Sequence, residues 1–111
     1  MPDYCFYYIR TLKSVTLSNA KEIGERAFSY CIALDQIDWG GSLERIAVRA
    51  FTNCYKLDNL VLPDTVISVE NYAFQRCDGL TRLTLGKSLL KFGDVPFESD
   101  GKTFGSVQPV L

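Results

Sequence analysis

Residues 66–85 read VISVENYAFQRCDGLTRLTL, and the apolar spacing within this stretch predicts the fold of the chain. Leu83 and Leu85 lie two residues apart at its end, which is typical of a short strand with one buried face. Val66 and Val69, three residues apart, are expected to begin the return path. One such unit cannot bury its apolar faces alone, whereas stacked copies can.

The same spacing recurs every 23 residues. Phenylalanine marks each copy, at Phe28, Phe51, Phe74 and Phe97. Three further columns hold nearly one residue type each: Ala27, Ala50 and Ala73; Cys31, Cys54 and Cys77; Leu34, Leu57 and Leu80. A step of 22 residues extends the register back to Cys5 and Phe6, and a one-residue insertion places Phe104, Val107 and Pro109 on the final columns. Such a period indicates a solenoid.

We therefore predict one domain over residues 1–111: a partial repeat 1–17, repeats at about 18–39, 40–62 and 63–85, and a degenerate repeat 86–111. The strands are expected to form a parallel sheet with a spacing of about 4.8 Å, in front of a stack of phenylalanines. Apolar residues three or four apart from Ala27 to Leu34 suit one or two turns of α- or 3₁₀-helix. The inward strand positions are Val15, Leu17, Ile37, Trp39, Leu60, Leu62, Leu83 and Leu85.

The combined A-F-x-x-C-x-x-L spacing resembles the BspA-type (Treponema-type) leucine-rich repeat over about residues 4–109. The matching residues are Val66, Val69, Ala73, Phe74, Cys77, Leu80, Leu83 and Leu85, and in an earlier copy Ile23, Gly24, Ala27, Phe28, Cys31, Leu34 and Ile37. The last repeat departs from the pattern at Pro96, Asp100 and Thr103. The resemblance implies an α/β solenoid: a right-handed superhelix with a short parallel strand and a turn or short helix per 23-residue repeat.

Composition excludes several classes of function. A net charge of −1 argues against a nucleic-acid groove. No apolar run approaches the roughly 20 residues that span a bilayer, and no signal peptide or anchor is seen. The chain has no histidine, which removes imidazole as a general base or zinc ligand. No carboxylate pair or glycine-rich phosphate loop is placed for chemistry, so we expect no enzyme, cofactor or metal.

The four cysteines allow more than one interpretation. No C-x-x-C pair suggests a metal site, and without histidine a cysteine nucleophile has no obvious base. A disulfide is harder to exclude, although equivalent residues in stacked repeats have parallel Cβ directions that suit one poorly. We expect Cys31, Cys54 and Cys77 to be small buried apolar residues, and Cys5, in an alanine column, to be packed as well.

Outward strand positions are the candidate binding surface, since a solenoid commonly uses its sheet for recognition. They are Ser14, Thr16, Gln36, Asp38, Asn59, Val61, Arg82 and Thr84. They can equally be plain solvated positions. Trp39 stands where other repeats have leucine, so it is either core or a platform for a ligand. Tyr4, Tyr7 and Tyr8 surround the first partial repeat, where a polar cap is normal.

By the resemblance, the sequence predicts a non-catalytic protein-protein interaction module, part of a bacterial or protist surface or secreted adhesin-like protein. The partner would be a host or cell-surface protein, with no nucleic acid and no membrane insertion. The alternative is a structural spacer or self-assembling unit, a homo-oligomer whose uncapped solenoid ends stack on other copies.

Overall fold

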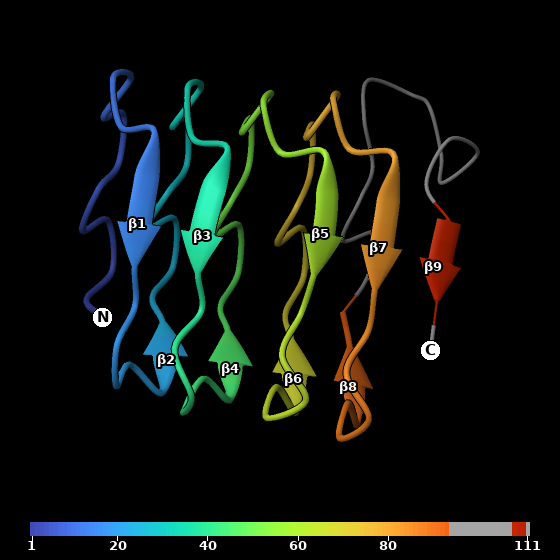
Figure 1. Ribbon diagram of the computed structural model, residues 1–111. Helices are drawn as coiled ribbons and strands as arrows, with labels where there is room; N and C mark the ends of the chain where they lie inside the picture. The colour runs from blue at the N-terminus through green and yellow to red at the C-terminus, as the bar shows by residue number, and fades with distance from the viewer. Residues whose placement is uncertain (94–107, 111) are drawn as a thin grey trace.

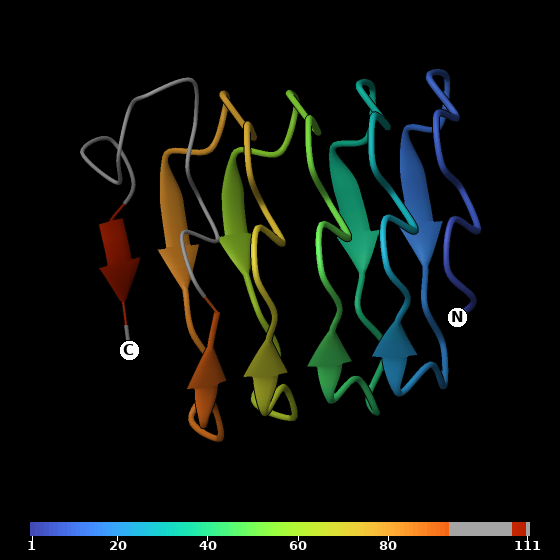
Figure 2. The same ribbon diagram turned by 180° about the vertical axis from the view of Figure 1, so that it is seen from behind.

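The structure, a computed structural model, describes residues 1–93 and the backbone of residues 108–110. Within them the chain winds as a solenoid of short parallel strands, with a front row and a back row (Figures 1 and 2). The front strands are β1 (Ser14–Thr16), β3 (Gln36–Asp38), β5 (Asn59–Val61), β7 (Arg82–Thr84) and β9 (Gln108–Val110). The back strands are β2 (Glu22–Ile23), β4 (Arg45–Ile46), β6 (Ser68–Val69) and β8 (Lys91–Phe92).

The back row forms one four-stranded sheet in the order β2-β4-β6-β8. Its register pairs Ile23 with Ile46, Ile46 with Val69, and Val69 with Phe92, so the column predicted as a return path is itself a strand. Ile23, Ile46 and Val69 are fully buried, whereas Phe92 is 37% exposed at the last described turn. This second sheet is not predicted by the apolar spacing, which indicated only a return path at these positions.

Turns replace the predicted helical segment. No helix occurs among the described residues, so the α part of the α/β class is not confirmed. The reason lies in the backbone: Tyr30, inside the segment from Ala27 to Leu34, has φ of 63°, and Arg26 just before it has φ of 54°. Every residue of a right-handed helix has negative φ, so a residue at positive φ interrupts it. Equivalent columns repeat this geometry at Arg49, Asn53, Tyr72 and Arg76.

A stack of phenylalanine rings runs along the interior. The ring centroids of Phe6 and Phe28, Phe28 and Phe51, and Phe51 and Phe74 lie 5.3, 5.0 and 5.3 Å apart, with planes within 12° of parallel. Phe28, Phe51 and Phe74 are fully buried, and Phe6 is half-buried at the end of the stack. Phe97 lies outside the described residues. Leu34, Leu57 and Leu80 complete the core beside this stack, at most 3% exposed.

The cysteine column is buried and reduced. Cys31, Cys54 and Cys77 are free thiols, each donating a hydrogen bond to the carbonyl of the phenylalanine one repeat earlier. The expectation for Cys5 is wrong, because this free cysteine is exposed. Cys5 lies in the first described turn, whereas Ala27, Ala50 and Ala73 of the same column lie further along the stack and are fully buried.

Strand β9 continues the front row in a register that differs from the predicted one. The structure pairs Pro109 with Leu83, whereas the sequence register put Val107 opposite Leu83 and Pro109 opposite Leu85. The one-residue insertion that aligned the last repeat is therefore too small. Pro96, Asp100, Thr103, Phe104 and Val107 lie outside the described residues, as does most of the degenerate repeat.

The front row is two sheets. Strands β1 and β3 form one, and β5, β7 and β9 form the other, with no pairing between β3 and β5. The prediction of a single parallel sheet is wrong at this point. Figure 1 shows β3 and β5 standing further apart than their neighbours on either side, while β4 and β6 behind them remain paired.

Candidate functional site

The split between β3 and β5 is the most distinctive feature of the front face. On one side of it, the Leu17 N–H donates to the Asp38 carbonyl at 2.8 Å; on the other, the Leu62 N–H donates to the Thr84 carbonyl at 2.9 Å. Among the described residues, no corresponding backbone bond links β3 to β5. The back sheet stays bonded at this level, with the Glu70 N–H donating to the Ile46 carbonyl at 2.9 Å.

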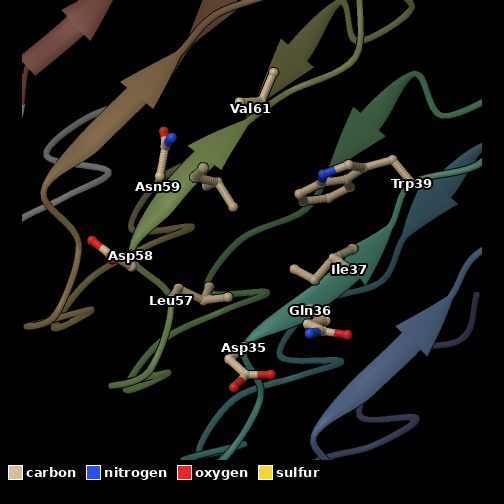
Figure 3. A pocket seen from close by; sticks show the side chains of 9 residues that line it. Asp35, Gln36, Ile37, Trp39, Leu57, Asp58, Asn59 and Val61 are labelled. Carbon is tan, nitrogen blue, oxygen red and sulfur yellow. The ribbon is translucent and has the colours of Figure 1, made fainter.

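Trp39 provides the physical reason for the split. It follows β3 in the column that holds Leu17, Leu62 and Leu85 in the other repeats. Figure 3 shows its indole extending from the end of β3 toward β5. Its ring packs edge-on against Phe51 with centroids 5.8 Å apart, and the residue is half-buried. Because indole is much larger than a leucine side chain, it occupies space that β5 would need to close on β3.

A pocket of about 380 Å³ lies between the two strands. It is lined by Asp35, Gln36, Ile37, Trp39, Leu57, Asp58, Asn59, Leu60 and Val61 (Figure 3). Ile37, Leu60 and Trp39 contribute apolar surface. Asp35 and Asp58, both exposed, precede the two strands, and no basic side chain belongs to the lining. The pocket therefore combines an apolar region with an acidic end.

The two carboxylates differ in their contacts. Asp58 accepts a 2.6 Å hydrogen bond from the Thr81 hydroxyl of the next repeat. Asp35 has no side-chain hydrogen bond or ion pair within the described residues, although its backbone N–H donates to the main-chain carbonyl of Lys13 at 3.0 Å. Asp35 is therefore the acidic group of the pocket that is most available to a cationic partner.

The outward positions proposed from sequence all lie on front strands. Ser14, Thr16, Gln36, Asp38, Asn59, Val61 and Arg82 are exposed, and Thr84 is half-buried. Only Gln36, Asn59 and Val61 line the pocket; the others lie on the strands beside it. Asp38 is engaged locally, accepting a 3.1 Å hydrogen bond from the Gly40 N–H.

Sequence reasoning missed two residues of this site, Asp35 and Asp58. Asp35 and Asp58 fall on variable columns, where nothing marks them as neighbours across a gap. For Trp39 the sequence leaves two alternatives, a core residue or a platform for a ligand. In the structure it has features of both, because it packs on Phe51 and also lines the pocket. The available signal was the size of Trp39 in a leucine column.

The buried thiols are chemically quiet. Burial raises the pKa of Cys31 to about 11 and raises that of Cys54 well above its usual value. Since the thiolate is the reactive form, neither is poised as a nucleophile. The described residues contain no group of cysteine and carboxylate side chains that could hold a metal ion, and no helix among them could cross a membrane.

Tyrosines gather at the N-terminal end of the solenoid. Tyr8 stacks on Tyr30 with centroids 4.4 Å apart, and Tyr7 meets both edge-on. Tyr4 and Tyr8 are each 48% exposed. This end of the described solenoid therefore presents aromatic surface to solvent.

Comparison with known proteins identifies the family. The BspA type leucine-rich repeat region matches residues 1–103 in six copies, and the chain belongs to this family. Its fold is a leucine-rich-repeat solenoid with parallel strands, and the family suggests a protein-interaction repeat module.

A solved structure supports the same fold. A leucine-rich repeat protein from Bacteroides ovatus superposes with a TM-score of 0.80 at 26% identity, over 85% of this chain. The chain spans 24% of the length of that protein. The search of curated proteins gives no match.

Proposed function

We propose that this chain is a non-catalytic module that binds another protein through its front face, within a surface or secreted adhesin-like protein. The observation that carries the proposal is the front face itself: its outward side chains are presented on strands that lie over a buried apolar core. Rigid presentation limits the entropy lost on binding. Family membership supports the interaction role, and the surface location is taken from the resemblance.

Apart from Val61, the outward side chains of the front strands are polar and varied in charge, and Asp38 and Arg82 lie on opposite sides of the split. Such a surface gives specificity through hydrogen bonds and charge complementarity more than through apolar burial. Affinity for a single copy of the module is therefore expected to be modest, and repetition would raise it through avidity.

The test is binding to a panel of extracellular-matrix glycoproteins immobilised on a sensor surface. For a glycoprotein that binds the parent chain, Asp38→Lys and Arg82→Glu should each weaken binding, because each variant reverses a charge on the front face. Lys87→Glu is the matched control, since Lys87 is exposed in the turn after β7, away from the front strands. Binding unaffected by both front variants, or equally affected by Lys87→Glu, would contradict the proposal.

The second candidate is self-assembly through the aromatic end, favoured by the exposed Tyr4 and Tyr8. Light scattering over a concentration series distinguishes the two. A concentration-dependent oligomer that dissociates in Tyr8→Ser but not in Tyr55→Ser supports assembly; Tyr55 is the control because it is also exposed, at 39%, but lies in a later repeat. A monomer at all concentrations contradicts it.

A further inference from the structure

The strand edges that face the split carry backbone groups with no partner. Along a parallel strand, the N–H and C=O of successive residues point to opposite sides. The Asp38 carbonyl points to β1, because it accepts from Leu17; the groups of Ile37 and Trp39 therefore point into the split. The Leu62 N–H points to β7, so the N–H and C=O of Val61 point into the split from the other side.

Asn59 faces the split for the same reason. The Asp58 carbonyl accepts from Thr81 and Arg82 of the next repeat, so the N–H and C=O of Asn59 point the opposite way. Within the described residues, no backbone bond joins these edges across the gap. Two parallel edges thus face one another, each with the donor and acceptor spacing of a strand that lacks its neighbour. Unpaired edges of this kind are templates for an added strand.

We propose that the split between β3 and β5 takes one extended peptide segment of a partner protein, which pairs with both edges and makes the front row continuous. The inference rests on the proposed function and names the binding mode. Backbone pairing on two sides supplies affinity, and the pocket walls select side chains. Inward residues of the segment meet Ile37, Leu60 and Trp39, so they are apolar. Outward residues of the segment face solvent and are polar, like Gln36, Asp38 and Asn59 on the two neighbouring strands, where Val61 is the exception.

The charges of the pocket determine which end of the segment lies beside Asp35 and Asp58. Asp35 and Asp58 lie at the end of the pocket where β3 and β5 begin, and Trp39 lies at the other end (Figure 3). The lining has no basic side chain to offset the two carboxylates. The segment therefore carries lysine or arginine at its end beside Asp35, followed by alternating apolar and polar residues toward Trp39.

The probe is an acetylated and amidated peptide, Lys-Val-Thr-Val-Thr, titrated into the full chain. Trp39 is the only tryptophan of the chain, so its emission reports the pocket directly, and binding should shift it to shorter wavelength. The same peptide with alternate backbone nitrogens methylated keeps its side chains and loses half of its donors. It should not bind. Amide exchange should also slow at Ile37, Asn59 and Val61 when the unmethylated probe is added.

Two chain variants test the geometry. Val61→Pro removes one donor from the split at an edge position where proline is tolerated, and should weaken the probe about fivefold; Val61→Thr keeps the donor and should bind as the parent does. Trp39→Leu restores the leucine of the other repeats, so β3 and β5 should pair, slow the exchange of the Asn59 and Val61 amides, and abolish probe binding measured by calorimetry.

Several results would overturn strand insertion. One is slow exchange at Asn59 and Val61 in the free chain, as slow as at Arg82 and Thr84, since the edges would then be covered already. Another is protection that rises with protein concentration, which would make a second copy the occupant. A third is equal binding of the methylated probe. A glycoprotein that still binds Trp39→Leu, while the probe binds neither chain, would leave the proposed function standing and exclude this mode.

Discussion

The thiol of Cys54 donates a 3.1 Å hydrogen bond to the main-chain carbonyl of Phe28, 26 residues earlier. Cys31 does the same toward Phe6 at 3.2 Å, and Cys77 toward Phe51 at 3.0 Å. The cysteine column therefore links each repeat to the one before it, in addition to filling space. A thiol suits this position because it is small, tolerates complete burial and still offers a weak donor.

Thiol accessibility should divide the four cysteines into two classes. Cys5 is exposed, while Cys31, Cys54 and Cys77 are buried. With a thiol reagent at pH 8, we expect one fast label per chain under native conditions and four in denaturant, because buried thiols react only when the chain opens. In Cys5→Ser the fast label should disappear. Fewer than four labels in denaturant would mean that a disulfide is present.

Alkaline pH should destabilise the protein through the buried thiols. Burial raises the pKa of Cys31 from 9.0 to about 11. The unfolded chain therefore loses this proton first, so its contribution to stability is complete below pH 9 and falls as pH rises toward 11. Urea titrations from pH 8 to 11 should show a shallower decline in Cys31→Ala than in the parent. Parallel curves for the two chains would contradict the raised pKa of Cys31.

Ser29 and Thr52 should show strong coupling. Their hydroxyls are hydrogen-bonded to each other across neighbouring repeats, and both residues are buried. Thr52→Val leaves the Ser29 hydroxyl without this partner and should cost about 1–3 kcal/mol in free energy of unfolding. Adding Ser29→Ala should recover part of that loss, because both polar groups are then removed together. Additive losses in a double-mutant cycle would contradict the coupling.

The phenylalanine stack should be most sensitive at its centre. Phe51 is fully buried between Phe28 and Phe74 and also contacts Trp39. Phe51→Ala should lower the free energy of unfolding by about 3–5 kcal/mol. Phe6→Ala, at the half-buried end, should cost clearly less in the same urea titration. Equal losses in free energy of unfolding would mean that the burial of a ring does not determine how much it stabilises the protein.

Arg26 offers a route to higher stability. Its φ of 54° is strained for a residue with a Cβ, and no side-chain bond of Arg26 holds it there among the described residues. Arg26→Gly should raise the free energy of unfolding by up to about 1 kcal/mol, and Arg26→Val should lower it by about the same amount. Thermal unfolding of the three chains gives the order. A glycine variant less stable than the parent would contradict the strain.

The repeat could be read from sequence because its signal lies in side chains. Phe28, Phe51 and Phe74 must face the interior in every turn, and the leucine pairs fix which face of each front strand is buried. The outward positions follow from the alternation of the strand. The family follows from the same columns, since the spacing itself is the family pattern.

Features carried by the backbone could not be read in this way. The back strands are two residues long and rest on main-chain bonds that any residue type can make. The left-handed positions hold residues such as Tyr30 and Arg49, so the glycine that usually marks positive φ is missing. The split depends on the volume of Trp39, which takes up space beside β5 of the next repeat. This contact between two repeats cannot be seen from an aligned column in which every residue is apolar.

The unbroken back sheet has a geometric consequence. When one side of a stack widens at a single level and the opposite side keeps its spacing, the axis of the stack must bend there. Strands β4 and β6 stay paired behind the separated β3 and β5, so the wedge at Trp39 tilts the surface of β1 and β3 away from that of β5 and β7. A ligand broad enough to touch both halves meets two planes that diverge from a crease, and a flat ligand can lie on only one of them.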